Sequence, residues 1–468
     1  MIRPPGTLTA SVHTMIRRFV LLWLVLAVSA AACGWDASEE VTTTTEPSPT
    51  TSASSTSTTT TEAETTTTEA APSTTAAALD DDLPLAYVEL VSAVEATRGL
   101  EFLSVPGVSV VSEEELARLV REEFDESVEP GDLAVDEALF ELLGLLDGSI
   151  DLAAAYEDLL AEQVAGFYDS DTGEMVVGGS LDLTPMTRFI LFHELVHALT
   201  DQHFGFGAAY DELIDQERYH EAAAMQALVE GDATYFQLVY FQSLPRDEQL
   251  EVIEESLAIE TPVTDALPDW FSADLGFPYD TGFRFVERIV SDSGIAGVDQ
   301  AYRLVPTTTE QVIHPDAYLR FEPARPVEVP DLAVEGYEVY ESGTLGEWNL
   351  DLMVLDGASD GDAVVASAGW GGDEYVILWN GEEVAFVLVY AGDTPGDAEE
   401  FADAAVEALT ENMNVGSALP GATEGTTVMT GGDYAFVGLD GATVVVVAAA
   451  DVETGSILTE QAFSPEGD

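Results

Sequence analysis

Residues 189–199 read FILFHELVHAL, an apolar stretch interrupted by two histidines and a glutamate. In a helix, His193 and His197 lie one turn apart on the same face and can present two imidazole nitrogens to a single metal ion. Glu194 lies about 100° round the helix from His193, beside that ion but not aimed at it. Burying these groups among apolar side chains is unfavourable without a partner, and a metal ion is such a partner. The stretch therefore predicts a buried helix with a metal site.

The residues around this stretch predict the other elements of the fold. Thr184 and Pro185 supply an N-cap and a first-turn proline, so we expect the helix to begin there and to run towards Gly205. Before it, the apolar patterns predict helices over 85–96, 113–124 and 151–164, a strand over 108–111, and a hairpin formed by 165–168 and 174–177. The alternative interpretation of His193 and His197 is that they are core histidines with hydrogen-bond partners and no metal.

Two residues compete to be the third metal ligand. His203 follows His197 by six residues, as in the metzincin motif, but Thr200 stands where that motif has a glycine that turns the chain. If the helix continues, His203 points about 240° away from His197. Glu230 lies in an alanine-rich helical stretch over 211–241, and a second helix packed on the first can deliver its carboxylate. These geometric arguments favour Glu230 over His203.

The pattern His193-Glu194-x-x-His197 followed by a helical Glu230 resembles the gluzincins, the thermolysin-like zinc metallopeptidases. The segments HELVHALTDQHF, ALVEGDAT and TTEQVIHPDAY together are similar to a group of bacterial secreted or lipid-anchored HExxH metallopeptidases. The resemblance implies a zincin-like α+β domain with a mixed sheet and an active-site helix, which binds Zn²⁺ through His193, His197 and Glu230. The gap of 33 residues between His197 and Glu230 is longer than in thermolysin and implies an insertion between the two helices.

The same chemistry assigns roles to further residues. Glu194 is placed to act as general base and then general acid in peptide-bond hydrolysis. We expect an extended peptide substrate to pair with the strand at Met175–Val177. Asp201 and Asp232 are candidates to orient a metal ligand. His314 is a candidate to donate to the oxyanion, with Tyr318 and Tyr235 as alternatives. We expect His220 to be structural. The alternative interpretations are that Asp201 and Asp232 are ordinary solvated acids and that His314 caps a turn.

The amino-terminal residues have the pattern of an export signal. Residues 1–32 contain no acidic side chain, and Arg17 and Arg18 precede an apolar run over 19–28. Cys33, the only cysteine of the chain, follows a run of small residues, as in the lipobox of bacterial lipoproteins. We therefore predict a signal peptide of lipoprotein type over 1–32 and a lipid on Cys33 that anchors the protein to a membrane.

An ordinary secretory signal is the alternative, because Ala30 stands where the lipobox usually has leucine. Residues 33–79 are rich in threonine and serine and predict a disordered stalk. The protein is thus expected outside the cytoplasm, either anchored to the cell surface or secreted.

The carboxy-terminal part has a different pattern. We expect a metallopeptidase domain over 80–330 and a small α+β domain of unknown role over 331–468, which contains no histidine or cysteine. Apolar runs joined through an Asn-Gly and an Asp-Gly pair predict two hairpins with a helix between them: strands 375–379 and 384–390, helix 396–413, and strands 434–439 and 442–449.

The charge of the chain excludes some classes of function. The 88 acidic residues outnumber the 14 basic ones, which are all arginine, so the net charge is −74. Such a chain repels phosphate backbones and anionic lipid headgroups, which excludes a nucleic-acid binder. The sequence predicts a zinc-dependent metallopeptidase, an endopeptidase that hydrolyses a peptide or protein substrate through a metal-activated water. The alternatives are a non-catalytic or inactive zinc-binding surface lipoprotein, and a hydrolase of cell-wall amides.

Overall fold

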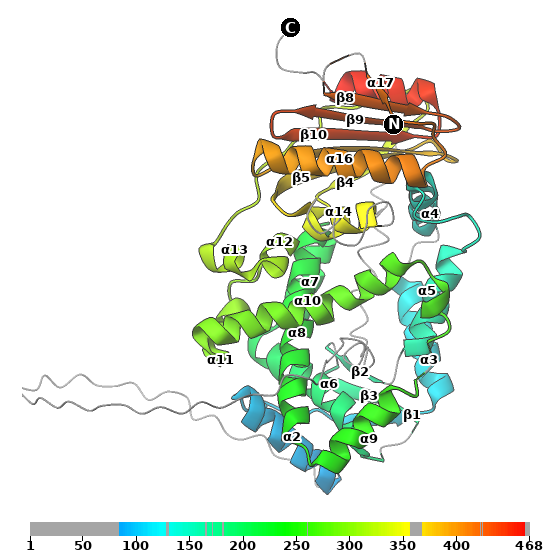
Figure 1. Ribbon diagram of the computed structural model, residues 1–468. Coiled ribbons are helices and arrows are strands. Elements are labelled where there is room, and N and C mark those ends of the chain that lie inside the picture. The colour runs from blue at the N-terminus through cyan, green and yellow to red at the C-terminus, as the bar shows by residue number, and fades with distance from the viewer. Residues whose placement is uncertain are drawn as a thin grey trace, which may run out of the picture.

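The structure, a computed structural model, describes residues 84–127, 131–163, 166–170, 172–179, 182–259, 261–355, 367–421, 423 and 425–463. The predicted signal peptide, the lipid site at Cys33 and the stalk lie outside these residues. The described chain is α+β, with a three-stranded sheet, a helical body and a seven-stranded sheet (Figure 1). None of the described helices is long and apolar enough to cross a bilayer.

The first elements build the small sheet and the helices beside it. They are α2 (Leu85–Arg98), β1 (Val108–Val111), α3 (Glu113–Ser127), α4 (Asp132–Leu143), α5 (Leu152–Gln163), β2 (Gly166–Asp169) and β3 (Glu174–Gly178). The predicted helices, strand and hairpin are confirmed to within a few residues, apart from residues 164–165, which are not described. Helix α4 has no counterpart in the sequence-based assignment. The sheet is mixed, because β3 pairs in parallel with β1 and antiparallel with β2.

The helical body follows. It contains α6 (Pro185–Phe204), α7 (Phe206–Asp215), α8 (Tyr219–Ser243), α9 (Arg246–Ser256), the 3₁₀ turn η2 (Thr264–Ala266), α10 (Asp269–Ser293), α11 (Ile295–Ala301), α12 (Thr309–Ile313) and α13 (Pro315–Arg320). The ends of α6 are as predicted: the Thr184 hydroxyl accepts from the Thr187 N–H at 3.1 Å, and Gly205 ends the helix in the left-handed conformation at φ 64°.

The expectation of one helical stretch over 211–241 is wrong in one respect. The stretch is divided between α7 and α8, because Glu217 adopts a left-handed backbone conformation with φ 63°. Helix α8 then packs on α6: the rings of Phe192 and Tyr240 stack with their centroids 4.4 Å apart, and the Gln237 side chain donates to the Phe189 carbonyl at 2.9 Å. The two helices that carry the predicted ligands are therefore neighbours.

The carboxy-terminal elements form the large sheet. They are β4 (Glu338–Gly343), α14 (Gly346–Leu355), β5 (Trp370–Trp379), β6 (Val384–Gly392), α16 (Pro395–Asn412), β7 (Leu419–Pro420), β8 (Thr426–Thr430), β9 (Tyr434–Asp440), β10 (Thr443–Ala449) and α17 (Val452–Ala462). The strand order is β4-β5-β6-β10-β9-β8-β7, and the pairs are antiparallel. Both predicted hairpins and the helix between them are confirmed. Helices α16 and α17 cover opposite faces of this sheet (Figure 1).

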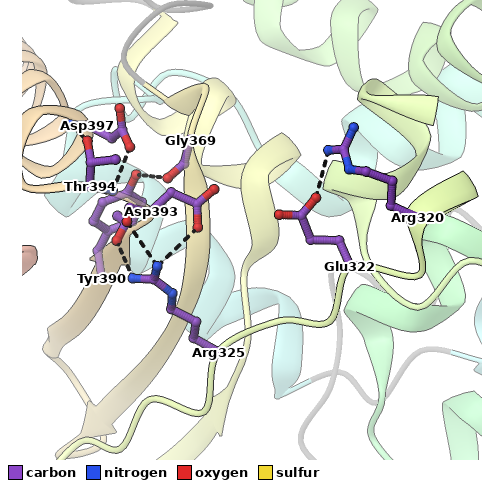
Figure 2. Close-up of polar contacts among 9 residues, drawn as sticks. Arg320, Glu322, Arg325, Gly369, Tyr390, Asp393, Thr394 and Asp397 are labelled. Atoms are coloured by element: carbon purple, nitrogen blue, oxygen red, sulfur yellow. Dashed lines mark hydrogen bonds and ion pairs between the residues drawn. The ribbon is translucent and has the colours of Figure 1, made fainter. Parts of the chain in front are cut away.

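The large sheet is joined to the helical body by packing and by the connecting segment. Leu139 of α4 and Trp270 of α10 belong to the same buried apolar cluster as Ile377 and Phe386 of the sheet. In the connecting segment, the Arg325 guanidinium donates to two backbone carbonyls at the end of β6, that of Gly392 at 2.7 Å and that of Asp393 at 2.9 Å. Figure 2 shows Arg325 beside Asp393. The two predicted domains thus share a core, although the predicted boundary falls close to this segment.

Candidate metal centre

Side chains from α6 and α8 converge at one buried point. The Nε2 atoms of His193 and His197 lie 3.0 Å and 3.3 Å from the same carboxylate oxygen, Oε2 of Glu230. The ligand atoms of His193, Glu194 and His197 also lie within 4.8 Å of one another, an arrangement that could hold a metal ion. All four side chains are buried, with no residue more than 2% exposed. The structure therefore brings together the four residues that the sequence singled out.

Burial and mutual contacts determine the protonation of this cluster without a metal. Burial lowers the pKa of His193, whose contact with Glu230 opposes the shift. Burial also acts to lower the pKa of His197, but the nearby carboxylates of Glu230, Glu194 and Asp232 outweigh it and raise that pKa. Burial alone would raise the pKa of Glu230, but the two imidazoles hold it at about 2. Glu230 is therefore a carboxylate that is hydrogen-bonded to the His193 ring and lies close to the His197 ring.

Glu194 occupies a different environment from Glu230. Burial raises its pKa to about 8, and the Glu230 charge adds to the shift while His197 opposes it. Its Oε2 accepts from the backbone N–H of Tyr168 in β2 at 3.0 Å. Its Oε1 is buried and has no hydrogen-bond partner within the described residues. One oxygen of this carboxyl group is thus fixed by the backbone, and the other is available.

The competing ligand His203 lies elsewhere. Thr200 remains helical and its hydroxyl donates to the Val196 carbonyl at 2.8 Å, so the chain does not turn back at this position. His203 is exposed, and its Nε2 lies 2.8 Å from the Glu101 carbonyl oxygen. Of the two candidates for the third ligand, the structure brings Glu230 to the histidine pair.

The two candidate acids behind the cluster differ in their contacts. Asp232 is fully buried, and its charge raises the pKa of His197. Asp201 instead accepts from the Tyr168 hydroxyl at 3.3 Å and from the Gly207 N–H at 3.0 Å. Asp232 is therefore the acid that acts electrostatically on the candidate ligand His197, whereas Asp201 is hydrogen-bonded to β2 and α7.

The three candidates for the oxyanion donor have their main contacts away from the cluster. The Nε2 atom of His314 lies 2.8 Å from Oε1 of Glu347 in α14. The Tyr318 hydroxyl donates to the Leu304 carbonyl at 2.7 Å, and the Tyr235 ring packs at 5.9 Å from that of Phe283. The oxyanion role of these residues stays a prediction. His220 is buried against Trp370 of the large sheet, with ring centroids 5.4 Å apart, as a structural residue would be.

Two residues at the cluster were missed in the sequence. Gln237 contacts His193 and acts to raise the pKa of that histidine, while its side-chain nitrogen donates to the Phe189 carbonyl. Tyr279 of α10 places its ring centroid 6.1 Å from that of His193. Gln237 lies seven residues after Glu230, hence on the same face of α8, so helical spacing could have identified it. No comparable signal marks Tyr279.

A small cavity opens beside Glu194. It has a volume of about 100 Å³ and is lined by Gly166, Phe167, Val177 and Gly178 of the small sheet and by Thr187, Ile190, Leu191 and Glu194 of α6. The expectation that a substrate pairs with Met175–Val177 is wrong, because β3 is the central strand and is already paired on both sides. The strand whose edge faces Glu194 is β2.

Comparison with known proteins gives information on the large sheet alone. A family model described as a domain of unknown function (DUF8575) matches residues 335–459, which run from just before β4 into α17. No curated protein and no solved structure matches the chain.

Proposed function

We propose that this protein is a zinc-dependent metallopeptidase. The proposal rests on one observation: the Nε2 atoms of His193 and His197 both lie close to one oxygen of Glu230. Glu194, the residue after His193 on α6, lies beside this group. In a zinc hydrolase, three protein ligands leave one coordination position open, and an adjacent carboxylate handles the proton.

The donor set fits Zn²⁺. Two imidazole nitrogens and one carboxylate oxygen are ligands that zinc accepts in catalytic sites. Oε1 of Glu230 is also buried without a hydrogen-bond partner within the described residues. A buried carboxylate left in this state is unfavourable unless a cation compensates it. Glu230 with His193 and His197 would hold the ion.

The bound ion would supply Lewis-acid polarisation of the scissile carbonyl and lower the pKa of a water molecule. The chain supplies the proton transfers. Oε1 of Glu194, the oxygen without a partner, takes a proton from the attacking water and returns it to the leaving amine. The Tyr168 N–H holds the other oxygen and so fixes the orientation of the carboxyl group. The ring of Tyr279 lies close to that of His193, so its hydroxyl is our candidate for the oxyanion donor.

The substrate is a peptide or protein chain. The cavity beside Glu194 is walled by Phe167, Ile190 and Leu191, so it suits an uncharged side chain next to the bond that is cleaved. A bound peptide would lie along β2 rather than along β3. The signal-like residues 1–32 and Cys33 support action outside the cytoplasm, on a membrane-anchored chain.

Metal analysis and peptide cleavage test the proposal together. The purified protein should contain about one zinc per chain and cleave casein, and Glu194→Gln should keep the zinc but lose cleavage. Glu212→Gln is a matched control, because Glu212 is exposed on α7 and its carboxylate accepts from the Gln216 side chain on the surface. A zinc-free protein, or a Glu194→Gln variant that cleaves at the full rate, would contradict the proposal. Zinc held by four protein ligands without cleavage would instead support a structural zinc in a surface lipoprotein.

A further inference from the structure

A second cavity lies where the helical body meets the large sheet. It has a volume of about 110 Å³, and its wall comes from α4, the start of α10, α14 and strands β4, β5 and β6. Most of the side chains that line it are apolar, among them the rings of Phe140, Trp270 and Phe386. It shares no lining residue with the cavity beside Glu194. Binding sites for small molecules form preferentially at junctions of this kind.

Two carboxylates face this apolar space from different elements. Asp136 of α4 is only 6% exposed, and Glu341 of β4 is half-buried. The hydroxyl of Tyr375, which also lines the cavity, donates to Glu341. None of the described residues that line the cavity is basic. The wall therefore offers negative charge and apolar surface to one small ligand.

The size of the cavity limits what it can hold. Unfilled space among apolar side chains lowers stability in proportion to its volume, so an occupant would stabilise this junction. An engineered apolar cavity of about 150 Å³ accepts benzene, so the space here suits one small ring or a short alkyl chain. Leu345 and Asn349 line the cavity and are half-buried, so the cavity reaches the surface and a ligand can enter there.

We propose that this cavity binds a small organic ammonium ion. The apolar body of the ligand packs among the rings of Phe140, Trp270 and Phe386. Its ammonium group contacts the carboxylates of Asp136 and Glu341, which would repel a ligand that carries a carboxylate or a phosphate. The net charge of −74 also raises the concentration of cations near the protein.

The inference gives the large sheet a role that does not depend on the proposed zinc centre. Glu341 and Tyr375 belong to the matched domain of unknown function over 335–459, whereas Asp136 and Trp270 lie outside it. The site is therefore complete only in the intact chain. Tyr219, the first residue of α8, also lines the cavity and precedes Glu230 by about 16 Å along the helix, so the two sites are separate.

Three probes of one shape separate the recognition of charge from the filling of space. Benzylamine carries an ammonium group, benzyl alcohol is neutral and benzoate is anionic. Isothermal titration calorimetry on the full chain at neutral pH measures the affinity of each. Benzylamine should bind about 10-fold more tightly than benzyl alcohol, because hydrogen bonds to charged groups are stronger than neutral ones. Benzoate should not bind.

Isosteric substitutions test the two carboxylates. Asp136→Asn and Glu341→Gln keep the shape of the wall, so each should weaken the binding of benzylamine by about 10-fold and leave benzyl alcohol unchanged. Glu338→Gln, at an exposed position of β4 outside the cavity, is the matched control and should alter neither affinity. Leu352→Phe narrows the cavity and should abolish the binding of both probes.

Two results would overturn the inference. One is the absence of benzylamine binding to the full chain, or an affinity no higher than that of benzyl alcohol. The other is benzylamine binding that neither isosteric variant weakens, which would be attraction to the acidic surface as a whole. Should Leu352→Phe not fold, the two isosteric variants still decide the question. Each of these results is independent of whether the protein contains zinc.

Discussion

Gly231 of α8 and Gly282 of α10 touch through their backbones. A Cβ on Gly282 would lie 3.2 Å from the Cα of Gly231, and a Cβ on Gly231 would overlap the carbonyl group of Gly282. Gly231 stands between Glu230 and Asp232, so the contact that brings the two helices together also sets how far both acids reach towards α6. Glycine is required at these positions because the backbones of α8 and α10 are in contact, and not because of an unusual backbone angle.

Gly231→Ala should separate α8 from α10 and move Glu230. We expect a loss of about 1–3 kcal/mol in the free energy of unfolding, as for other overpacked cores, together with a weaker zinc affinity. Denaturant unfolding and chelator competition measure the two effects. Gly276→Ala on α10 is the matched control, because its Cβ would meet only Asp280 at 3.6 Å. That variant should gain up to about 1 kcal/mol, since alanine favours a helix more than glycine. Equal stabilities for the two variants would contradict the argument.

Removal of the third ligand should distinguish Glu230 from His203. Glu230→Ala should lower zinc affinity by about 100-fold or more, because it removes a ligand rather than a supporting residue. His203→Ala should leave zinc content unchanged, since its ring contacts the Glu101 carbonyl on the surface. Elemental analysis of dialysed protein measures both. The opposite pattern would restore His203 as the ligand.

Tyr279→Phe tests the donor role that the position of this ring suggests. If its hydroxyl stabilises the oxyanion, kcat should fall by about 10²–10³-fold while zinc content stays at the wild-type value. Steady-state cleavage of a fluorogenic peptide gives kcat and KM separately. Tyr318→Phe, whose hydroxyl donates to the Leu304 carbonyl, serves as the comparison and should retain kcat. A large effect only at Tyr318 would return the donor role to the sequence-based candidates.

The stability of the fold should depend on pH through His220. Burial lowers the pKa of this histidine from 6.5 to about 4, so between these values the unfolded chain binds a proton that the folded chain does not. Its contribution to stability is therefore present above pH 6.5 and is lost as the pH falls towards 4. The shift corresponds to at most about 3 kcal/mol. His220→Phe should flatten the slope of unfolding free energy against pH in this range.

A chain that ends at residue 330 should not fold stably. It would expose Leu139, Phe140 and Trp270, which in the intact protein belong to one buried cluster with Ile377 and Phe386 of the large sheet. We expect aggregation or strong binding of a hydrophobic dye. A chain that begins at residue 80 keeps this cluster and is the control. A soluble, cooperatively unfolding 80–330 fragment would show that the two predicted domains are independent.

The sequence predicted those parts of the centre that depend on short spacing. The caps at Thr184 and Gly205 and the one-turn separation of His193 and His197 are local, so α6 and the face that carries both histidines could be assigned. Glu230 could be proposed because a helix with a carboxylate at a suitable distance follows. How close the Glu230 carboxylate comes to α6, however, depends on the contact of Gly231 with α10.

The parts that could not be predicted depend on long-range packing. Arg98 of α2 pairs with Asp232 behind the cluster, and Tyr279 of α10 lies beside His193, and no spacing relates those two helices to α6. The central position of β3 was missed for a similar reason. Its parallel partner β1 lies more than sixty residues earlier, and the helices between them hide the pairing from a local pattern.

The candidate metal centre and the ion pairs of Arg98 with Asp232 and Asp299 join segments that lie far apart in the chain. Arg98 and Asp299 are separated by 201 residues, and Glu230 follows His193 by 37. A growing chain can form the His193–His197 pair early, but Glu230 requires α8 to be made and docked, and the ion pair of Arg98 with Asp299 requires α11 as well. A partly synthesised or unfolded chain thus lacks a competent centre. Under the proposed function, the chain is therefore unable to digest itself or its neighbours before folding is complete.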